Sequence, residues 1–442
     1  MAITDDNAFE LPRLRSSFTL ENDTEFLEND NCAEFFDVKF CPYQPLDAPP
    51  VFAAISKKHV SLPGSSLLFQ DNLSRSSRSS YAHSLKQLTP IHDEASACCC
   101  TWTKDPETGA PYLCIGGVDA KVKIYDVVNG KLYRCLTGHG GVRPSTPTRS
   151  AYAHAYRGHT ANRESVAFYG DCILSRACHD NVISLWRIEG FSSANPPPAE
   201  SEAPTAQTTV PTNYEEASRL TRSAFVPTIS PQCPSQYTML LQFYTPNCGP
   251  QFFMRFKLHF VPDQHPVLAF CNAAGNVFFW DFERLVAYRE FMEALKDPGR
   301  DKSKQLPHPS WMRQVKTRSK TDSKGRQGGG DKDVPSTFRA DAIRLSEEIG
   351  DYNVETLETW ASRYSQDDPH EPLKAHKTES SSANFVGRQT AWSPGGEWCV
   401  VVGSSNQALI LQRWANKGST SRASASASAS VPPSVSAQNG AV

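Results

Sequence analysis

Three adjacent cysteines, Cys98, Cys99 and Cys100, form the densest group of nucleophilic or metal-ligating side chains in the chain. If they form a strand, Cys98 and Cys100 share one face of the sheet and Cys99 points to the other. A tetrahedral zinc site requires ligands spaced around the ion, and none of the 13 cysteines belongs to a CxxC pair. We therefore interpret the three cysteines as small buried hydrophobic residues and predict no metal site.

Other patterns that would indicate catalysis are missing from the sequence. The 12 histidines form no HExxH motif, and the chain has no GxxxxGK[ST], no GxSxG and no GxGxxG that opens a helix. We therefore predict a protein that is not an enzyme and uses no cofactor. A hydrolase or transferase with an unrecognised site is the alternative.

The charge balance excludes several classes of protein. The 442 residues include 45 Lys and Arg against 47 Asp and Glu, a net charge of −2, which gives no chain-wide reason to bind DNA or anionic lipid. No apolar run approaches the ~18 residues of a membrane-spanning helix. The first 20 residues include acidic side chains and no apolar core, so we expect no secretory signal. Scattered, odd-numbered cysteines favour a reducing compartment, the cytosol or the nucleus.

Composition divides the chain into segments that can pack and segments that carry too little apolar surface to offset chain entropy. The predicted division is an N-terminal tail (1–34), a first strand-rich segment (35–191), a Pro/Ser/Thr-rich linker (192–236), a second strand-rich segment (237–282), an insertion (283–384), a last strand-rich segment (385–416) and a disordered Ser/Ala-rich tail (417–442).

The insertion is predicted to have helical ends and a basic, disordered middle. Residues 283–296 place apolar side chains on one helical face, and residues 339–363 form a second helical stretch interrupted by Gly350. Residues 300–332 hold ten Lys or Arg against three Asp. This basic run could contact the phosphates of nucleic acid, or it could be a solvated loop.

A short pattern recurs along the strand-rich segments: a turn, then alternating apolar residues that end in an aromatic residue. Each copy follows an apolar stretch and is predicted to form a short strand after a tight turn. The clear copies lie at 119–126, 180–186 and 274–281, with weaker ones at 51–62 and 398–414.

Gly-His pairs accompany these copies, at 138–139 and 158–159. Gly-His, paired strands, a turn aspartate and a terminal Trp-Asp are typical of a WD-repeat blade. In such a blade, side-chain hydrogen bonds tie one four-stranded sheet together. We therefore predict an all-β WD-repeat β-propeller with about five recognisable blades and long insertions. We assign structural roles in it to Asp119, Tyr125, His139, Asp180, Trp186, Trp280 and Asp281.

The number of blades poses a problem. A WD-repeat blade needs roughly 40–45 residues, but the two Gly-His pairs are only 20 residues apart. We predict that residues 142–157 form no complete blade. The ring then either stays open or closes with fewer blades than usual.

Four segments resemble the WD-repeat Polycomb proteins of the embryonic ectoderm development / extra sex combs family, in a fungal-looking version. Residues 101–140, 166–191, 251–281 and 386–414 are similar to the family's second, fifth, sixth and seventh blades, and residues 35–62 to its first. The strings CILSRACHDNVISLW, MRF and GRQTAWS are specific to this likeness. The family's third and fourth blades have no counterpart, which agrees with the short Gly-His spacing.

The resemblance implies a nuclear, non-catalytic scaffold of a Polycomb repressive complex 2-like histone H3 lysine methyltransferase, acting in transcriptional repression. Its implied partners are a helix of the SET-domain methyltransferase subunit, other Polycomb subunits and, on the opposite face, the methylated histone tail. A WD-repeat adaptor of another assembly, such as a ubiquitin ligase, is the alternative.

The resemblance also implies an aromatic cage for trimethyl-lysine, which holds the ammonium by cation–π attraction. Two neighbouring cage aromatics of the family correspond to Phe252 and Phe253, and an arginine beside the cage to Arg388. Where the family has a Phe and a Tyr, this chain has Ala97 and Leu136, so we expect histone binding to be weak or lost. The alternative for Phe252 and Phe253 is an ordinary pair of strand residues.

Overall fold

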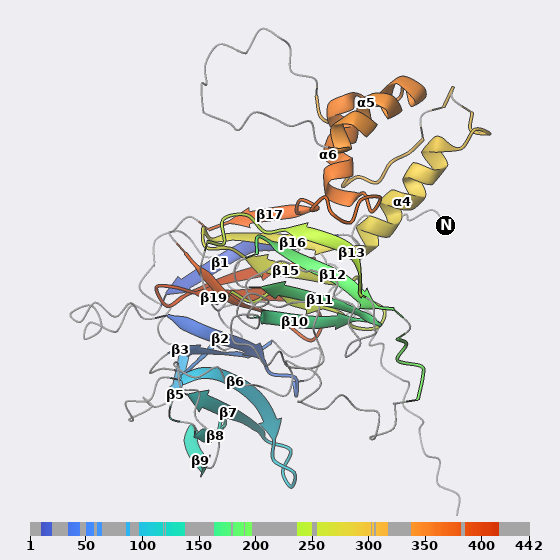
Figure 1. Cartoon of the computed structure of the whole chain (residues 1–442). Coiled ribbons are helices and arrows are strands. Elements are labelled where there is room, and N and C mark those ends of the chain that lie inside the picture. The colour runs from blue at the N-terminus through green and yellow to red at the C-terminus, as the bar shows by residue number, and fades with distance from the viewer. Residues whose placement is uncertain are drawn as a thin grey trace, which may run out of the picture.

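Among the residues that it describes, the computed structural model of the chain contains five four-stranded antiparallel sheets and a lobe of three helices (Figure 1). Five sheets of this kind confirm the predicted all-β fold. The structure describes residues 10–19, 34–44, 50–56, 60–63, 85–88, 97–117, 119, 121–137, 163–177, 180–189, 191–196, 237–249, 254–301, 303–304, 306–316, 337–381 and 385–414.

We number the sheets I to V along the chain and name their strands from the inner edge outward. Sheet I contains β2 (Phe35–Phe40), β3 (Phe52–Ser56), β4 (Val60–Pro63) and β5 (Leu85–Leu88). Sheet II contains β6 (Ala97–Lys104), β7 (Pro111–Gly117), β8 (Val122–Asp126) and β9 (Lys131–Leu136). Sheet III contains β10 (Arg163–Tyr169), β11 (Cys172–Ala177), β12 (Val182–Ile188) and β13 (Tyr237–Tyr244).

The last two sheets complete the set. Sheet IV contains β14 (Lys257–His259), β15 (Val267–Cys271), β16 (Asn276–Asp281) and β17 (Lys377–Ser380). Sheet V contains β18 (Gly387–Trp392), β19 (Trp398–Gly403), β20 (Gln407–Gln412) and, outermost, β1 (Arg13–Thr19).

Face-to-face packing places the sheets in the spatial order III, IV, V, I, II. Successive strand residues point to opposite faces, so one strand serves two neighbours. In β15, Leu268 and Phe270 pack toward sheet III, whereas Val267 and Ala269 pack toward sheet V. Four apolar clusters fill the four junctions, and among the described residues none joins sheet II to sheet III.

The N-terminal residues do not all form a tail, as the sequence had predicted for residues 1–34. Residues Arg13–Thr19 form β1, which pairs antiparallel with β20, and Leu11 is buried between sheets IV and V. The alternation of β1 is too polar to identify it as a strand. Its partner lies almost 400 residues away, so only the tertiary fold shows the pairing.

Two predicted boundaries cut through sheets. Strand β13 lies beyond the predicted linker but pairs with β12, which completes sheet III. Strand β17 lies inside the predicted insertion but pairs with β16, which completes sheet IV. In both sheets the outermost strand therefore joins across a long intervening segment.

Residues 142–157, which the sequence predicts to form no complete blade, lie outside the described part of the chain.

The helical lobe stands on the outer edges of sheets III and IV (Figure 1). Helix α4 (Phe282–Lys296) follows β16 directly, and α5 (Thr337–Ile349) and α6 (Val354–Tyr364) are separated at Gly350, as the sequence predicted. Asp281 begins α4 by accepting the backbone N–H of Glu283 (3.1 Å).

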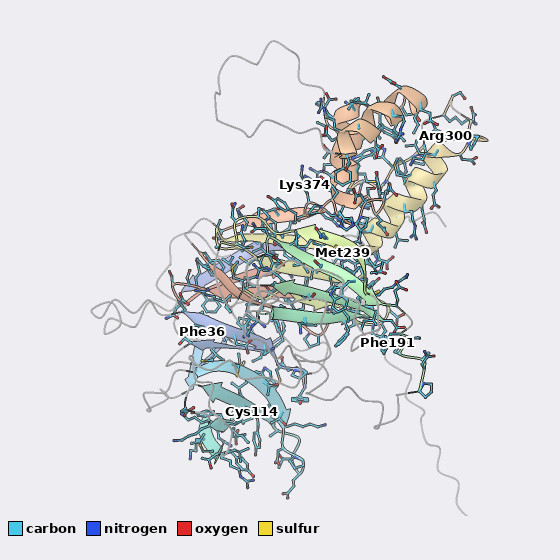
Figure 2. The ribbon with its side chains drawn as sticks, viewed as in Figure 1. Phe36, Cys114, Phe191, Met239, Arg300 and Lys374 are labelled. Atoms are coloured by element: carbon cyan, nitrogen blue, oxygen red, sulfur yellow. The ribbon has the colours of Figure 1, made fainter. Side chains whose placement is uncertain are left out.

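Part of the predicted disordered middle packs against this lobe, which corrects the prediction. Met312 is fully buried, and the Trp311 ring lies 4.9 Å from that of Tyr364. Arg300, labelled in Figure 2, forms an ion pair with Asp351 at 2.6 Å. A few large apolar residues thus anchor residues 306–316 despite the high local charge. Residues 317–336 lie outside the described part.

His376 connects the lobe to sheet IV as a neutral ring. Its Nδ1 accepts the backbone N–H of Asp281 (3.0 Å), and its Nε2 lies 2.8 Å from the carbonyl of Arg363, so Nε2 carries the proton. Burial, reinforced by the charge of Arg284, holds the pKa of His376 well below its usual range. Burial also lowers the pKa of His259.

These histidines should make the protein less stable in mild acid. Because their folded-state pKa lies below the unfolded value, the unfolded chain binds more protons as pH falls below about 6.5. We expect the free energy of unfolding, from urea denaturation, to fall between pH 7.5 and 5.5. The variant H376Q should be less stable at pH 7.5 by about 1–3 kcal/mol and less sensitive to pH. The variant H370Q, at an exposed histidine, serves as the control. If the stability of H376Q falls with pH as steeply as that of the unmodified chain, His376 is not a source of the pH dependence.

Candidate functional site

The first residues of the inner strands meet on one face of the arc of sheets. Inner strands β2, β6, β14 and β18 neighbour one another, and each begins on this face. The face, which we call the upper face, therefore collects Glu34, Ala97, Cys98, Arg255 and Arg388. Every one of these residues comes from the start of an inner strand or the residues just before it.

Gly387 sets the position of Arg388. A Cβ at Gly387 would lie 2.4 Å from Cβ of Cys271, so only glycine lets β18 approach sheet IV this closely. Its N–H donates to the carbonyl of Asn272 (3.2 Å). The next carbonyl, that of Arg388, accepts the N–H of Arg255 (3.0 Å). The backbone of sheet V is thereby fixed to the segment that precedes β14.

The Arg388 guanidinium pairs with a carboxylate from the far end of the sequence. Its Nη2 lies 3.2 Å from Oε2 of Glu34, and both side chains are largely buried. The pair joins sheet V to the residue before β2. Within this pair the two charges cancel, and Arg255 adds a positive charge to the same face, so these three groups give no electrostatic preference for a cationic ligand.

The segment before β14 is anchored by its backbone. Arg176 donates from Nη1 to the carbonyl of Met254 (3.3 Å), and the Met254 side chain is fully buried. These contacts bring residues 254 and 255 to the upper face beside Arg388. Cys98 and Cys99 are exposed and only Cys100 is buried, so the prediction of three buried cysteines is wrong for two of them. Phe252 and Phe253, the predicted cage residues, lie outside the described residues.

Ala97 cannot serve as a cage wall. Its side chain is buried at the junction of sheets I and II with Cys41 and Ile55. A phenylalanine at this position would overpack that cluster. The alanine therefore contributes to the contact between the two sheets.

Leu136 and Tyr133 lie away from the inner strands. Both belong to β9, the outermost strand of sheet II, which is three strand spacings, about 14 Å, from β6. The Tyr133 ring stacks on Tyr112 at 4.9 Å, toward the end of the sheet opposite Ala97. Neither side chain joins Arg388 in one site.

The residues assigned to blade structure have specific surroundings. Trp186 donates its indole N–H to the Ser175 hydroxyl (2.8 Å), and Trp280 donates to the carbonyl of Leu373 (3.3 Å). Asp119 pairs with Lys123 (3.2 Å) and Tyr125 is buried against sheet I.

Three more residues complete that set. The N–H of Asp180 donates to the carbonyl of Ala177 (3.2 Å) in the β11–β12 turn. Asp281, fully buried, caps α4 and faces His265 and Arg284. His139 lies outside the described residues.

Sequence reasoning missed Glu34 and Arg255. Glu34 had been placed in a tail, and no local pattern connects it to a residue 354 positions away. In the described part of the chain, no group of three or more His, Cys, Asp or Glu could hold a metal ion, and no described helix is long and apolar enough to cross a membrane.

Comparison with known proteins identifies relatives along nearly the whole chain, although no family model matches. The chain is 33% identical to Polycomb protein EED of Chaetomium thermophilum, over 94% of this chain and 98% of that protein. The alignment spans 567 residues although this chain has 442. At least 125 residues of the relative therefore have no counterpart here.

Solved structures agree with this match. A chain of the C. thermophilum PRC2 complex with H3K27me3 and H3K27M is 34% identical, with a TM-score of 0.66 over 93% of this chain and 99% of that chain. A chain from the crystal structure of the C. thermophilum polycomb repressive complex 2 gives the same identity and TM-score over 92% and 98%.

The close approach at Gly387 can be tested by mutation. We expect G387A to destabilise the protein by about 1–3 kcal/mol, because the added methyl group overpacks the junction with Cys271. The measurement is the free energy of unfolding from urea denaturation. The control is G395A, in the turn of the same sheet, where an added Cβ meets nothing within 4 Å. Equal stability of the two variants would contradict this account of how Arg388 is positioned.

Proposed function

The chain belongs to the Polycomb protein EED family, and from this membership we propose that it is the WD-repeat scaffold of a PRC2-like histone H3 lysine methyltransferase. In this role the chain is not an enzyme: it holds the catalytic subunit and presents a binding face to the histone tail. The nucleus is its place of action, and repression of transcription is the outcome.

The main support for the proposal is the 33% sequence identity with Polycomb protein EED of C. thermophilum, over 94% of this chain and 98% of that protein. Similarity confined to WD-repeat signatures would fit any adaptor. Here it extends through the inserted helices and loops between the sheets. The relatives with the same fold and 34% identity are PRC2 chains, which favours the Polycomb scaffold over the ubiquitin-ligase adaptor.

The methyltransferase helix needs an apolar surface on the lower face, opposite Arg388. Phe260 lies there, in the loop after β14, and is 51% exposed. Its ring rests on Tyr169 at 5.1 Å, and Tyr169 in turn packs on Phe282 of α4 at 4.8 Å. An exposed aromatic ring held from below by other rings is a suitable anchor for an amphipathic helix.

We expect the tagged full-length chain to co-purify with a SET-domain methyltransferase from its own cells. Phe260→Lys should reduce the recovered methyltransferase at least tenfold, because a charge replaces an apolar anchor. Val128→Lys, at a residue 60% exposed in the β8–β9 turn, should have no effect. Absence of any SET-domain protein from the unmodified chain would reject the Polycomb assignment. Loss in both variants would reject only the role of Phe260.

The histone tail would bind on the upper face, beside Arg388 and Glu34. Phe252 and Phe253 supply the aromatic residues of the proposed cage, because they directly precede the anchored Met254. Two rings of the family cage are replaced, by the buried Ala97 and by the outlying Leu136. Each ring contributes ~0.5–2 kcal/mol to holding an ammonium, so roughly 1–4 kcal/mol of binding is missing.

We therefore expect little discrimination between trimethylated and unmodified H3 peptides. The missing energy corresponds to a loss in affinity of about fivefold to nearly a thousandfold. Isothermal titration calorimetry with the paired peptides measures it. A clear trimethyl preference that disappears in the double variant F252A/F253A, but persists in F191A, would show that two rings suffice and would contradict the expectation.

The proposal that the basic run 300–332 contacts nucleic acid rests on its charge alone. Arg300 is engaged by Asp351, so the remaining charges would carry the contact. Such binding would weaken steeply with added salt and show little sequence preference.

A further inference from the structure

Strand β6 has an irregularity at the point where three cysteines follow one another. Its pairing with β7 shifts by one residue between Ala97 and Cys99, so Cys98 is an extra residue in the strand. A β-bulge of this kind sets two residues of one strand opposite one residue of its partner and re-aims a side chain. The regular alternation of β6 is therefore interrupted at the cysteines.

Burial along β6 shows the result of this shift. Ala97 and Cys100 are buried toward sheet I, whereas Cys98 and Cys99 between them are both exposed. In an uninterrupted strand, two successive side chains point to opposite faces. Here both thiols point away from sheet I, which corrects the prediction that Cys98 shares a face with Cys100.

The partner strand leaves room for the Cys99 thiol. Gly116 of β7 pairs with Cys99, and a Cβ at Gly116 would lie 3.1 Å from the Cys99 sulfur. The S–H of Cys99 donates to the carbonyl of Gly116, with a sulfur–oxygen distance of 3.8 Å. Because Cys98 is exposed as well, a small reagent in solution reaches both sulfur atoms.

The number and spacing of these thiols restrict the chemistry that they can perform. Two thiols are too few for a structural zinc site, which takes four protein ligands, and no group of three or more metal-ligating residues occurs in the described part of the chain. A direct disulfide would be strained, because adjacent Cα atoms are about 3.8 Å apart, against ~4.4–6.8 Å in ordinary disulfides. Strained, exposed disulfides are readily reduced. A ligand that inserts one atom between the two sulfurs avoids both restrictions.

We propose that Cys98 and Cys99 form a dithiol site for a trivalent arsenic compound with two exchangeable hydroxyl ligands. Thiolates are soft ligands and prefer soft, thiophilic centres. On capture, two As–O bonds break and two As–S bonds form, and each hydroxyl group leaves as water with one thiol proton. Neither arsenic nor sulfur changes oxidation state, so no oxidant or reductant is needed. Because the second As–S bond forms within one molecule, the pair binds more tightly than a single thiol.

Titration of the full chain with phenylarsine oxide, whose hydrate carries two hydroxyl groups, tests the site by native mass spectrometry. The unmodified chain should retain one phenylarsenic group in millimolar glutathione and release it to 1,2-ethanedithiol, since only another dithiol competes with chelation. C98S and C99S should each lower the affinity for this group by about 10²–10⁴-fold. The result does not depend on the proposed scaffold function.

Two other cysteines of sheet II provide matched controls. Cys135 is exposed on β9, and Cys114, labelled in Figure 2, lies on β7 opposite Thr101. C135S and C114S should bind the arsenical as the unmodified chain does, and all four variants should keep its circular dichroism spectrum. Peptide mapping of the unmodified chain is a check that needs no variant, because bound arsenical should protect Cys98 and Cys99 from iodoacetamide.

Several outcomes would overturn this assignment. Undiminished binding by C98S or C99S would do so, as would removal of the phenylarsenic group by glutathione. Loss of the group in C135S or C114S would assign it to a different pair of thiols. Alkylation of Cys98 and Cys99 by iodoacetamide in the loaded chain would contradict the proposal even if the serine variants failed to fold.

Discussion

Face-to-face packing of neighbouring sheets is the interaction on which the rest of the structure depends. Alternating side chains of one strand fill two junctions at once, as Leu268 and Val267 of β15 do. At about 1.5–3 kcal/mol for each fully buried aliphatic or aromatic side chain, these junctions are the main source of stability. They also determine where the inner strands begin, and therefore which residues meet on the upper face.

The same constraint explains the consequences of a shortened series of sheets. The two end sheets differ in this respect. On sheet II the outward ring of Tyr133 is 56% exposed, whereas on sheet III the outward side chains of Ile173 and Trp186 are buried. Each end sheet has one junction with a described neighbour, and the scaffold faces above and below the sheets remain available to other partners.

Scaffold and reader functions depend on different parts of this architecture. The surface around Phe260 rests on the junction of sheets III and IV and on helix α4, all of which are present. A methyl-lysine cage requires several rings to converge on one point. The chain positions Arg388 and Glu34 on the upper face, but it buries the Ala97 side chain between sheets I and II and leaves Leu136 at an outer edge. We therefore regard assembly with a methyltransferase as the more robust of the two functions.

The sequence alone determined the blade type, the approximate number of sheets, the helices on either side of Gly350 and the family, because strand alternation, turn residues and specific motifs are local signals. Only the tertiary structure decided that polar β1 completes sheet V, that β13 and β17 close sheets across long segments, and that Glu34 pairs with Arg388. These partners lie tens to hundreds of residues apart, and no local pattern encodes a contact whose energy comes from packing between sheets.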